Sequence, residues 1–356
     1  MSYSAQQVCD QISDLVVSCE NAEREFSDLS PLESYKESSL IFISDEAQFE
    51  NLTEPLPAVI VTTPKIAEQL AQIHSNNRNL SVVAVQNVRL ALALVKQRYD
   101  DYDASDSEWS AIHSSAVIHK STQLGTGVRV GPNSVIGKGV KIGNSTVIRA
   151  NCVIEHDAQI GENCVIHSLV NIGYECRLGN HVIIRPGATI GNEGFGFAQD
   201  AEHRYQRIPH TGIVEIQDDV QIGANCNIDR GTYGKTVVSR GVKLDSLCHI
   251  AHNVFIDEDT VFASQSGVAG STHIGKRVIG SGQTGVLDHR VVCDDATLLH
   301  RCGVTEDITE KGLWAGTPPK PFKEYVSNLN PYTKLKRLEK RIDQKLAELK
   351  SLIDKV

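Results

Sequence analysis

An aliphatic residue returns at every sixth position through the middle of this chain. The first run is Ile112, Ile118, Leu124, Val130, Ile136, Ile142, Ile148, Ile154, Ile160, Ile166, Ile172, Leu178, Ile184 and Ile190. After slips in phase it resumes as Ile216, Ile222 and Ile228, then Val238, Leu244, Ile250, Ile256, Phe262, Val268 and Ile274, then Val286, Val292, Leu298 and Val304. Helical faces repeat about every 3.6 residues and strand faces every two, so a period of six predicts a hexapeptide-repeat parallel β-helix.

Two other positions of the repeat support a three-sided prism. Glycine often follows the aliphatic residue, as at Gly125, Gly131, Gly137, Gly143, Gly161, Gly173, Gly179, Gly191, Gly223 and Gly275. We interpret these glycines as corners that need backbone angles open to glycine. Small or thiol side chains lie four residues after the aliphatic ones, at Thr146, Cys152, Cys164, Cys176, Cys226, Cys248 and Cys302. We expect them inside a narrow core; an antiparallel sandwich is the alternative.

Charge and cysteine usage restrict the class of protein. The chain has 356 residues and a net charge of -9, which argues against nucleic-acid binding and against a polybasic membrane surface. Its nine cysteines are odd in number and follow the repeat, so we expect reduced thiols in a cytoplasmic protein. Neither a signal-like start nor an apolar run of about 20 residues occurs, so no transmembrane segment is expected.

The pattern divides the chain into three parts. Residues 1–105 alternate short apolar runs with helix-like stretches, which predicts a small α/β domain that ends in an acidic, serine-rich linker at 100–107. Residues 106–315 form the predicted β-helix, and residues 316–356 form a helical extension. From residue 321 onward nine basic residues face five acidic ones, a balance of +4. A solvated helix face explains this charge, and a docking surface for an acidic partner is the alternative.

The largest interruption of the repeat, 191–214, contains Phe195 and Phe197. A regular rod gains nothing from ejecting such a loop, so we expect the loop to cover a site. The alternative is that the two rings only anchor the loop on the prism or on a neighbouring subunit.

Polar groups gather where the repeat loses its corner glycines, around Ile250. His252 lies two residues past Ile250 and should point outward, where an imidazole can act as a general base. Asp245 is the nearby carboxylate that we expect to orient it. His289 follows 37 residues later, one more than two coils, so we expect it on the same side of the prism. Since many of the thirteen histidines occupy turns, His252 is also open to a purely structural interpretation.

Two other kinds of chemistry are less well supported by the sequence. No serine or cysteine stands in a recognisable nucleophile motif. A zinc site made by His249, His252 and His289 is the metal alternative, although no tight ligand motif is present.

Several segments together resemble the UDP-3-O-(3-hydroxyacyl)glucosamine N-acyltransferases of lipid A biosynthesis. The segments are Gly194-Phe195-Gly196-Phe197, Ile228-Asp229-Arg230-Gly231, Cys248-His249-Ile250-Ala251-His252-Asn253-Val254, Ala269-Gly270-Ser271 and Ala315-Gly316-Thr317-Pro318. The likeness covers nearly the whole chain. It implies a mainly β protein: a left-handed parallel β-helix with a small N-terminal α/β domain and a C-terminal α-helix.

The resemblance also implies a reaction. A 3-hydroxyacyl chain moves from acyl carrier protein to the 2-amino group of a UDP-3-O-acylglucosamine. His252 matches the family's general base, Asp245 the carboxylate that orients it, and His289 a second active-site histidine. The N–H of Gly270 matches a proposed oxyanion donor.

The family's assembly and donor site follow from the same resemblance. His249 and Asn253 match residues that flank the entry of the phosphopantetheine arm. That arm is carried by the acyl carrier protein, so no cofactor is expected. The family forms a homotrimer with sites between subunits.

The sequence departs from the family at the uridine and acyl sites. Phe42 matches an aromatic residue that holds the uridine, but Asp45 stands where Asn is usual and Gln48 where Tyr is usual. Phe49 is the nearest substitute for that Tyr. Gly303 is small where a larger residue can close the acyl groove, so we expect the groove to accept long chains.

Three alternatives compete with this interpretation. The UDP-N-acetylglucosamine O-acyltransferases are the nearest rival enzymes, but they lack a counterpart of the first hundred residues. A carbonic anhydrase-like zinc trimer and a non-catalytic scaffold trimer are the others.

Overall fold

The computed structural model describes residues 2–73, 77–101, 109, 111–329 and 331–353. The chain divides into two compact units, Met1–Asp103 and Ala104–Val356. The predicted linker and the predicted boundary near residue 105 fall largely outside the described residues. Each unit is therefore described by itself.

The N-terminal unit is an α/β domain, as expected. Its five-stranded sheet has the order β2-β7-β6-β5-β4, antiparallel only between β2 and β7. The strands are β2 (Val16–Glu20), β7 (Ser81–Val85), β6 (Val59–Thr62), β5 (Ser39–Ile43) and β4 (Asp28–Leu29), with β1 (Tyr3–Ser4) and β3 (Glu25–Phe26) pairing separately. The helices are α1 (Ala5–Gln11), η1 (Ser13–Leu15), α2 (Glu46–Glu50), α3 (Pro64–Ile73) and α4 (Val88–Tyr99). Successive residues of β5 alternate between two hydrophobic cores, so each face of the sheet is covered.

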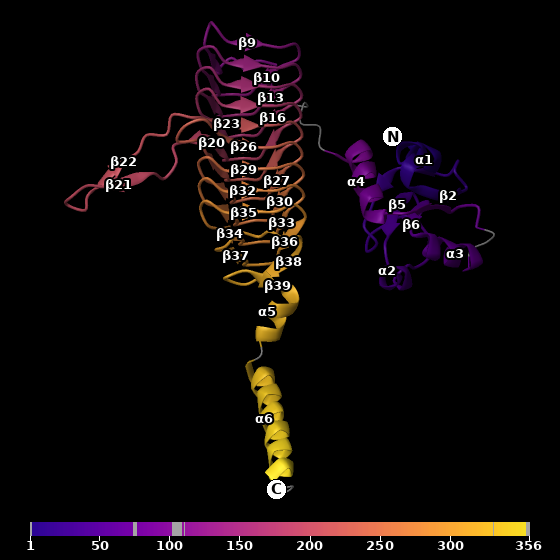
Figure 1. Cartoon of the computed structure of the whole chain (residues 1–356). Helices are drawn as coiled ribbons and strands as arrows, with labels where there is room; N and C mark the ends of the chain where they lie inside the picture. Colours follow the sequence, from indigo (N-terminus) through magenta and orange to yellow (C-terminus); the bar gives the residue numbers. More distant parts are fainter. Residues whose placement is uncertain (1, 74–76, 102–108, 110, 330, 354–356) are drawn as a thin grey trace. The chain divides into compact units, whose positions relative to one another are not determined.

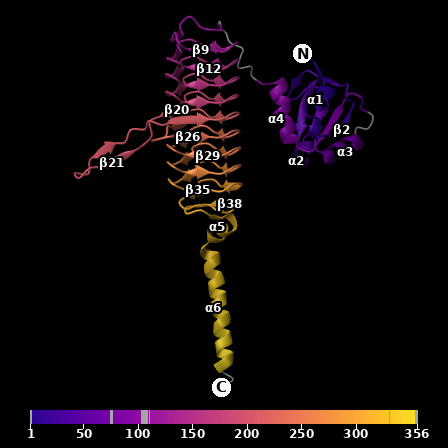
Figure 2. The same cartoon turned by 45° about the horizontal axis from the view of Figure 1, so that its top comes forward.

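The second unit contains a parallel β-helix with three faces, seen as stacked coils in Figures 1 and 2. The first face holds β10 (Arg129–Val130), β13 (Val147–Ile148), β16 (Val165–Ile166), β19 (Ile183–Ile184), β24 (Gln221–Ile222), β27 (Lys243–Leu244), β30 (Val261–Phe262), β33 (Ile279–Gly280), β36 (Ala296–Leu298), β38 (Gly312–Ala315) and β39 (Lys320–Pro321). The second face holds β8 (Val117–Ile118), β11 (Val135–Ile136), β14 (Val153–Ile154), β17 (Asn171–Ile172), β20 (Thr189–Asn192), β25 (Asn227–Asp229), β28 (His249–Ile250), β31 (Gly267–Val268), β34 (Gly285–Val286) and β37 (Gly303–Val304). The third face holds β9 (Gln123–Leu124), β12 (Lys141–Ile142), β15 (Gln159–Ile160), β18 (Arg177–Leu178), β23 (Ile213–Ile216), β26 (Lys235–Val238), β29 (Phe255–Ile256), β32 (His273–Ile274) and β35 (Val291–Val292).

The core of the rod is the predicted aliphatic column. In regular coils a strand pairs with the strand eighteen residues later, so Ile136 lies over Ile154 and Ile154 over Ile172. The six cysteines of the repeat are buried beside these residues, as expected. Burial raises the pKa of the Cys152 thiol to about 11, so this group stays protonated and unreactive near neutral pH. All nine cysteines are free thiols.

The corner glycines have a different role from the one predicted. The left-handed backbone conformation falls three residues after the aliphatic position, at residues such as Asn133, Asn151 and Asp157, with φ near 57°. Asn and Asp tolerate this conformation better than most residues. Gly143, by contrast, is needed because a Cβ there would lie 2.6 Å from the carbonyl carbon of Gly161 in the next coil. Close stacking of coils, rather than φ, explains glycine at this position.

One pair of residues explains a gap in the aliphatic series. Phe262 is fully buried, and Gly280 takes the aliphatic position one coil later. A Cβ on Gly280 would lie 2.2 Å from the Phe262 ring, so the larger side chain fills the space of both.

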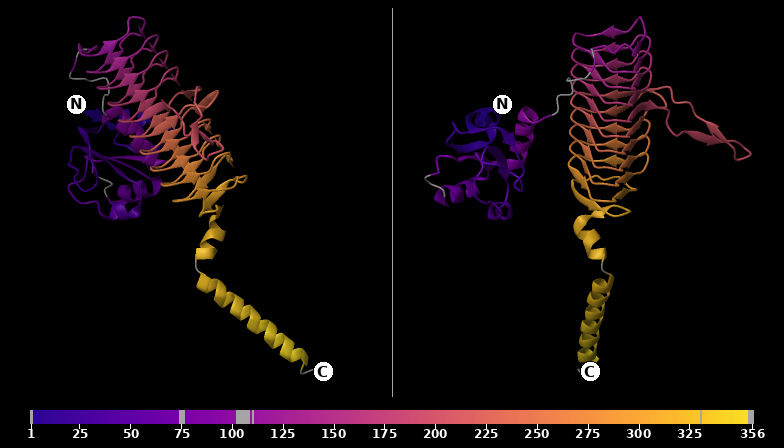
Figure 3. Two further views of the ribbon diagram at one scale, coloured as in Figure 1. Left: turned by 90° about the vertical axis from the view of Figure 1, so that its left-hand side faces the viewer. Right: turned by 180° about the vertical axis from the view of Figure 1, so that it is seen from behind.

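Two insertions break the regular coils on the same side of the rod. The longer one contains a hairpin of β21 (Phe197–Gln199) and β22 (Tyr205–Arg207), which projects from the rod in Figures 1 and 3. The shorter one separates β25 from β26, and it lengthens that coil so that Ile228 pairs with Ile250, 22 residues later.

The rod ends in α5 (Phe322–Leu329), which contacts β38 and β39, and is followed by α6 (Pro331–Ile353). Leu335, Leu338, Ile342 and Leu346 lie three or four residues apart on α6 and are exposed, as are Lys340 and Arg341. The helical extension was predicted from this spacing. No helix in the described part of the chain combines the length and apolar character needed to cross a membrane.

Candidate active site

A groove of about 710 Å³ runs along the second face of the rod. Its floor is a column of glycines, because Gly267, Gly285 and Gly303 follow one another in register below His249. A Cβ at Gly267 or Gly285 would meet no atom within 4 Å, so the space over them is open. The column therefore leaves a trough where side chains would otherwise stand.

Three of the four predicted catalytic residues gather at this groove. His252, Gly270 and His289 all line it, together with His249 and Gly303. The reason is the coil geometry: the residues that follow β28, β31 and β34 stack at one corner of the prism. This stacking is recorded by hydrogen bonds from the Ser271 N–H to the His252 carbonyl and from the His289 N–H to the Gly270 carbonyl.

The ring of His252 points outward and lies against the backbone of Gly270. A Cβ on Gly270 would be 2.7 Å from both Cε1 and Nε2 of the ring, so a larger residue there would displace the ring. Among the described residues, no acceptor is recorded for the backbone N–H of Gly270. Gly270 is buried against the His252 ring.

The neighbours of His252 fix its tautomer. Nδ1 lies 3.2 Å from Oδ1 of Asn253 and 3.4 Å from the hydroxyl of Thr232. The Asn253 amide cannot be reversed, because its Oδ1 accepts from the Thr232 N–H and its Nδ2 donates to the Tyr233 carbonyl. Nδ1 must therefore carry the proton, and Nε2 keeps the lone pair that a general base needs.

The expected contact between His252 and Asp245 of the same chain is wrong. Asp245 follows β27 and lies at the corner between the first and second faces, where it accepts hydrogen bonds from the N–H groups of Ser246 and Ser264. His252 lies at the next corner. Each side of the prism has six residues, so residues seven apart occupy neighbouring corners rather than the same one.

The carboxylate beside these histidines is Asp229, which the sequence analysis did not single out. It ends β25, is 2% exposed, and its Oδ2 lies 3.5 Å from Nε2 of His249. Burial raises the pKa of Asp229, and the charge of His249 opposes that shift. Counting the lengthened coil after Ile228 would have found it, because Asp229 then stacks next to Ala251.

The long loop brings a third histidine to the site. His210 is 3% exposed, and its ring centroid lies 4.8 Å from that of His252 in an edge-to-face arrangement. A Cβ at Gly194 or Gly196 would lie within 2.8 Å of the His210 ring, so the loop encloses it closely. The loop therefore contributes to the site itself, whereas Phe195 is 84% exposed at the edge of the groove.

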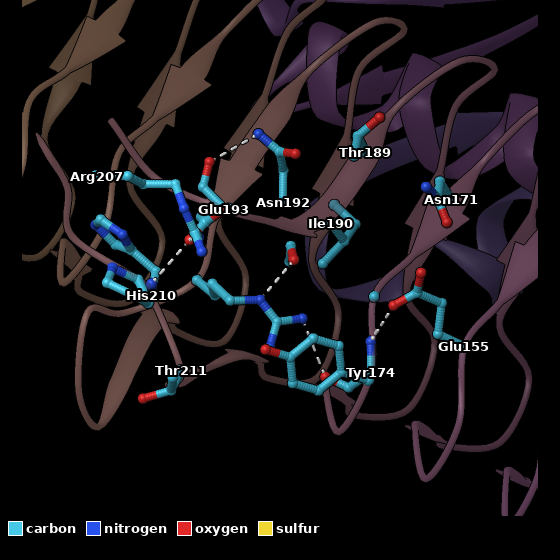
Figure 4. A pocket seen from close by; sticks show the side chains of 14 residues that line it. Glu155, Asn171, Tyr174, Thr189, Ile190, Asn192, Glu193, Arg207, His210 and Thr211 are labelled. Carbon is cyan, nitrogen blue, oxygen red and sulfur yellow. Dashed lines mark hydrogen bonds and ion pairs between the residues drawn. The ribbon is translucent and has the colours of Figure 1, made fainter. Parts of the chain in front are cut away.

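His210 also borders a second, polar pocket of about 350 Å³, shown in Figure 4. Glu193 connects the start and the end of the long loop there, because its carboxylate accepts a hydrogen bond from the His210 N–H and forms an ion pair with Arg207. These two partners lower the pKa of Glu193, the His210 N–H having the larger effect. The buried Arg230 guanidinium lies 3.4 Å from the centroid of the Tyr174 ring, and donates to the Gly191, Gly212 and Tyr174 carbonyls.

The predicted uridine residues of the N-terminal unit do not form one aromatic clamp. Phe42 packs against the core on one face of the sheet, and Phe49 packs against the core on the other. The side chain of Asp45 accepts from the Gln48 N–H and caps α2, and Gln48 in turn accepts from the Ser44 N–H. Asp45 and Gln48 therefore serve helix capping in this structure.

The donors for the zinc alternative are not assembled within one chain. Among the described residues, no three His, Cys, Asp or Glu side chains are arranged to hold a metal ion. His249 instead pairs with Asp229, and Nδ1 of His252 faces Asn253.

Comparison with known proteins now decides the family. The chain is 49% identical over 323 residues to the UDP-3-O-acylglucosamine N-acyltransferase of Methylococcus capsulatus, covering 89% of this chain and 90% of that protein. The chain belongs to the UDP-3-O-acylglucosamine N-acyltransferase family. The enzyme of the same name from Helicobacter hepaticus is 37% identical over 322 residues, which cover 90% of this chain and 92% of that one.

The fold of this N-acyltransferase family member is shared with a solved acyltransferase. The Arabidopsis UDP-N-acetylglucosamine acyltransferase is 26% identical, with a TM-score of 0.51, over 58% of this chain and 71% of that one. Residues 108–193 match a family model described as the GMPPB C-terminal domain. The predicted left-handed β-helix and the prediction of an acyltransferase are confirmed.

Proposed function

We propose that this chain transfers a 3-hydroxyacyl group from acyl carrier protein to the 2-amino group of UDP-3-O-acylglucosamine, in the cytoplasmic synthesis of lipid A. The observation that carries the proposal is a histidine at the head of an apolar groove whose Nδ1 is held by Asn253, which leaves Nε2 as the basic nitrogen, in a chain of this family. Two relatives that carry the family name, from Methylococcus capsulatus and Helicobacter hepaticus, match about nine tenths of the chain.

Thioester aminolysis needs a base and an oxyanion donor, but no enzyme nucleophile. Nε2 of His252 takes a proton as the amine attacks the thioester carbon. The Asn253 side chain holds Nδ1–H and stabilises the cationic ring. The Gly270 N–H stabilises the oxyanion of the tetrahedral intermediate, and collapse of that intermediate breaks the C–S bond. The proton on His252 then passes to the departing thiolate.

The groove suits the acyl chain of the product or donor. It extends from His252 over the glycine column to Gly303, and its lining includes Val268, Val286 and Val304. A trough of this kind accepts a straight hydrocarbon chain over Gly267 and Gly285. At its far end the Thr317 side chain lies over Gly303, where a Cβ would be 2.2 Å from the Thr317 hydroxyl oxygen.

The partners of this enzyme are proposed from charge and exposure. Three chains would enclose the outward-facing site between subunits, because a prism with external catalytic groups cannot enclose a substrate alone. Within such a trimer, Asp245 remains a candidate only toward His252 of a neighbouring subunit. The exposed basic residues of α6 offer a docking surface for the acidic acyl carrier protein.

The test is an assay with UDP-3-O-acylglucosamine and a panel of acyl carrier protein thioesters, read by mass spectrometry. We expect His252→Ala to lower kcat by roughly 10²–10⁴-fold without unfolding the rod, since the side chain faces outward. His273→Ala is the matched control, because His273 is an exposed strand histidine that stacks on Phe255 outside the groove. Full activity of His252→Ala would remove this base from the mechanism.

The same assay distinguishes the proposed N-acyl transfer from the O-acyl transfer of the sister enzymes. An N-acyltransferase gives an amide that survives mild alkaline hydrolysis, whereas an O-acyltransferase adds an ester that does not. Acylation of UDP-N-acetylglucosamine to an ester product would favour the sister activity.

A further inference from the structure

The ring of His210 carries a hydrogen-bonding atom that the described residues leave without a partner. Its Nδ1 lies 2.9 Å from the Ile208 carbonyl oxygen, which can only accept, so Nδ1 is the protonated nitrogen. Nε2 then has a lone pair, is buried, and has no hydrogen-bond partner within the described ranges of the chain. Buried polar atoms in native proteins nearly always have a partner, so this atom requires an explanation.

The ring has no freedom to turn toward a partner elsewhere. Gly194 and Gly196 press against it so closely that a Cβ at either position would lie 2.5–2.8 Å from ring atoms. On its other side the ring meets His252, at 4.8 Å between centroids. The loop thus fixes Nε2 of His210 beside the proposed base, at the boundary between the apolar groove and the polar pocket.

Asp229 adds a second buried acceptor in the same place. Its Oδ2 faces His249, and among the described residues its Oδ1 has no hydrogen bond, although the Asn192 side chain lies near enough to lower the pKa of the carboxyl. The site is therefore short of a donor at Nε2 of His210. A bound molecule can supply that donor.

We propose that His210 is a substrate-binding residue whose Nε2 accepts a hydrogen bond from an O–H or N–H group of a bound substrate. Two sources supply that chemistry: the hydroxyl of the 3-hydroxyacyl chain, and the amino or hydroxyl groups of the acceptor sugar. The inference rests on the proposed function, because it takes both substrates from it.

A pair of amide substitutions tests this contact. In His210→Gln the side-chain amide reaches the position of Nε2 and can still accept there. In His210→Asn the amide reaches only the position of Nδ1, so it keeps the donor to the Ile208 carbonyl and loses the acceptor. We expect kcat/KM to fall by about 10²-fold in His210→Asn and to stay within about tenfold of the wild type in His210→Gln. A structural role would give the reverse order, since His210→Asn keeps the internal hydrogen bond.

The substrates identify the donor. If the acyl hydroxyl is the donor, the wild type prefers a 3-hydroxyacyl thioester to the unsubstituted thioester of equal length, and His210→Asn loses that preference. If the sugar is the donor, His210→Asn raises KM for the sugar and lowers the rate with both thioesters equally. Either result supports the contact. Wild-type kcat/KM in His210→Asn on every substrate, or equal losses in both variants that follow a lowered unfolding temperature, would overturn it.

A measurement on the wild type covers the case in which the variants do not fold. With histidine labelled by the heavy nitrogen isotope, the NMR signal of His210 Nε2 should move upfield when the donating substrate binds. An unmoved signal at saturating substrate would reject the contact. His252→Ala, assayed in parallel, tests the base assignment separately: its full activity would reject the base, whereas the His210 results concern the binding contact alone.

Discussion

At the scale of single residues, the site depends on what lies next to each imidazole. His252 has its tautomer set by Asn253, whose amide is held by two backbone hydrogen bonds, and its ring rests on Gly270. His210 was not found from the sequence because the long loop brings it to the site, and Asp229, at the end of β25, was missed because the coil that follows it is longer than eighteen residues. Their positions depend on how two irregular loops fold onto regular coils.

Gly270→Ala tests the contact between the ring and the backbone. The new Cβ would lie 2.7 Å from Nε2, so His252 must move away from its position against Gly270. Displacement of a catalytic group by about 1 Å costs roughly 10²-fold in rate, and we expect a loss of kcat of that size. Circular dichroism should show an unchanged rod. An alanine variant with wild-type kcat would show that the ring tolerates the displacement.

Asp229→Asn tests the electrostatic state of the buried carboxyl. Because the pKa of Asp229 is raised in the folded protein, the folded state binds the proton more tightly, and stability falls as pH rises above the ordinary pKa of 3.8. The Asp229→Asn variant has no carboxyl group at this position, so its stability does not fall with pH for this reason. We expect urea denaturation to show it more stable than the wild type at about pH 8, with the difference shrinking toward about pH 4. The exposed Asp259→Asn serves as control, and an equal difference at both pH values would contradict the expectation.

At the scale of elements, each position of a coil has its own structural requirement. The aliphatic and thiol positions fill the core, and the third position after the aliphatic residue takes the left-handed conformation. The position directly after the aliphatic residue is glycine in coils such as that of Gly143, where a Cβ would meet the following coil. On the second face, glycine also replaces the outward residue of β31, β34 and β37, and this replacement produces the groove.

Gly285→Leu tests the groove. The position is open, so the leucine side chain should enter the groove without disturbing the coil. Long acyl chains would then lose contact at about 0.8 kcal/mol for each excluded methylene, or roughly fourfold in kcat/KM per carbon. Short chains should react as in the wild type, and they form the internal control. A parallel loss at all chain lengths would mean that the groove does not hold the acyl chain.

At the scale of the whole molecule, the chain combines an α/β unit, a rod and a helical extension of different character. The net charge of the chain is -9, yet Lys340 and Arg341 lie exposed on α6. Opposite charge on a partner accelerates association, and this acceleration depends on the salt concentration. The extension is thus the part best suited to an acidic protein partner.

Lys340→Glu with Arg341→Glu tests this docking surface. We expect KM for an acyl carrier protein thioester to rise by about tenfold or more at low salt, because like charges now meet. The rate with a small pantetheine thioester should not change, since that substrate needs no docking. Glu339→Lys with Asp343→Lys is the matched reverse change and should lower KM for the protein substrate. An equal effect on the acyl carrier protein thioester and on the pantetheine thioester would show that the substitutions do not act through protein docking.

The sequence by itself determined the rod. A strict period of six buries every aliphatic residue when the chain forms a three-sided helix. Regular coils then pair residues eighteen apart. The core and the stacked corner with His252, Gly270 and His289 therefore follow from the residue spacing. Tertiary structure alone decided which groups surround that corner. Asp245 is seven residues from His252 and lies at another corner, whereas His210 reaches the site on a long insertion and Asp229 lies opposite Ala251 because an insertion follows β25. A period can be read from spacing, but the path of an insertion is set by contacts that spacing does not contain.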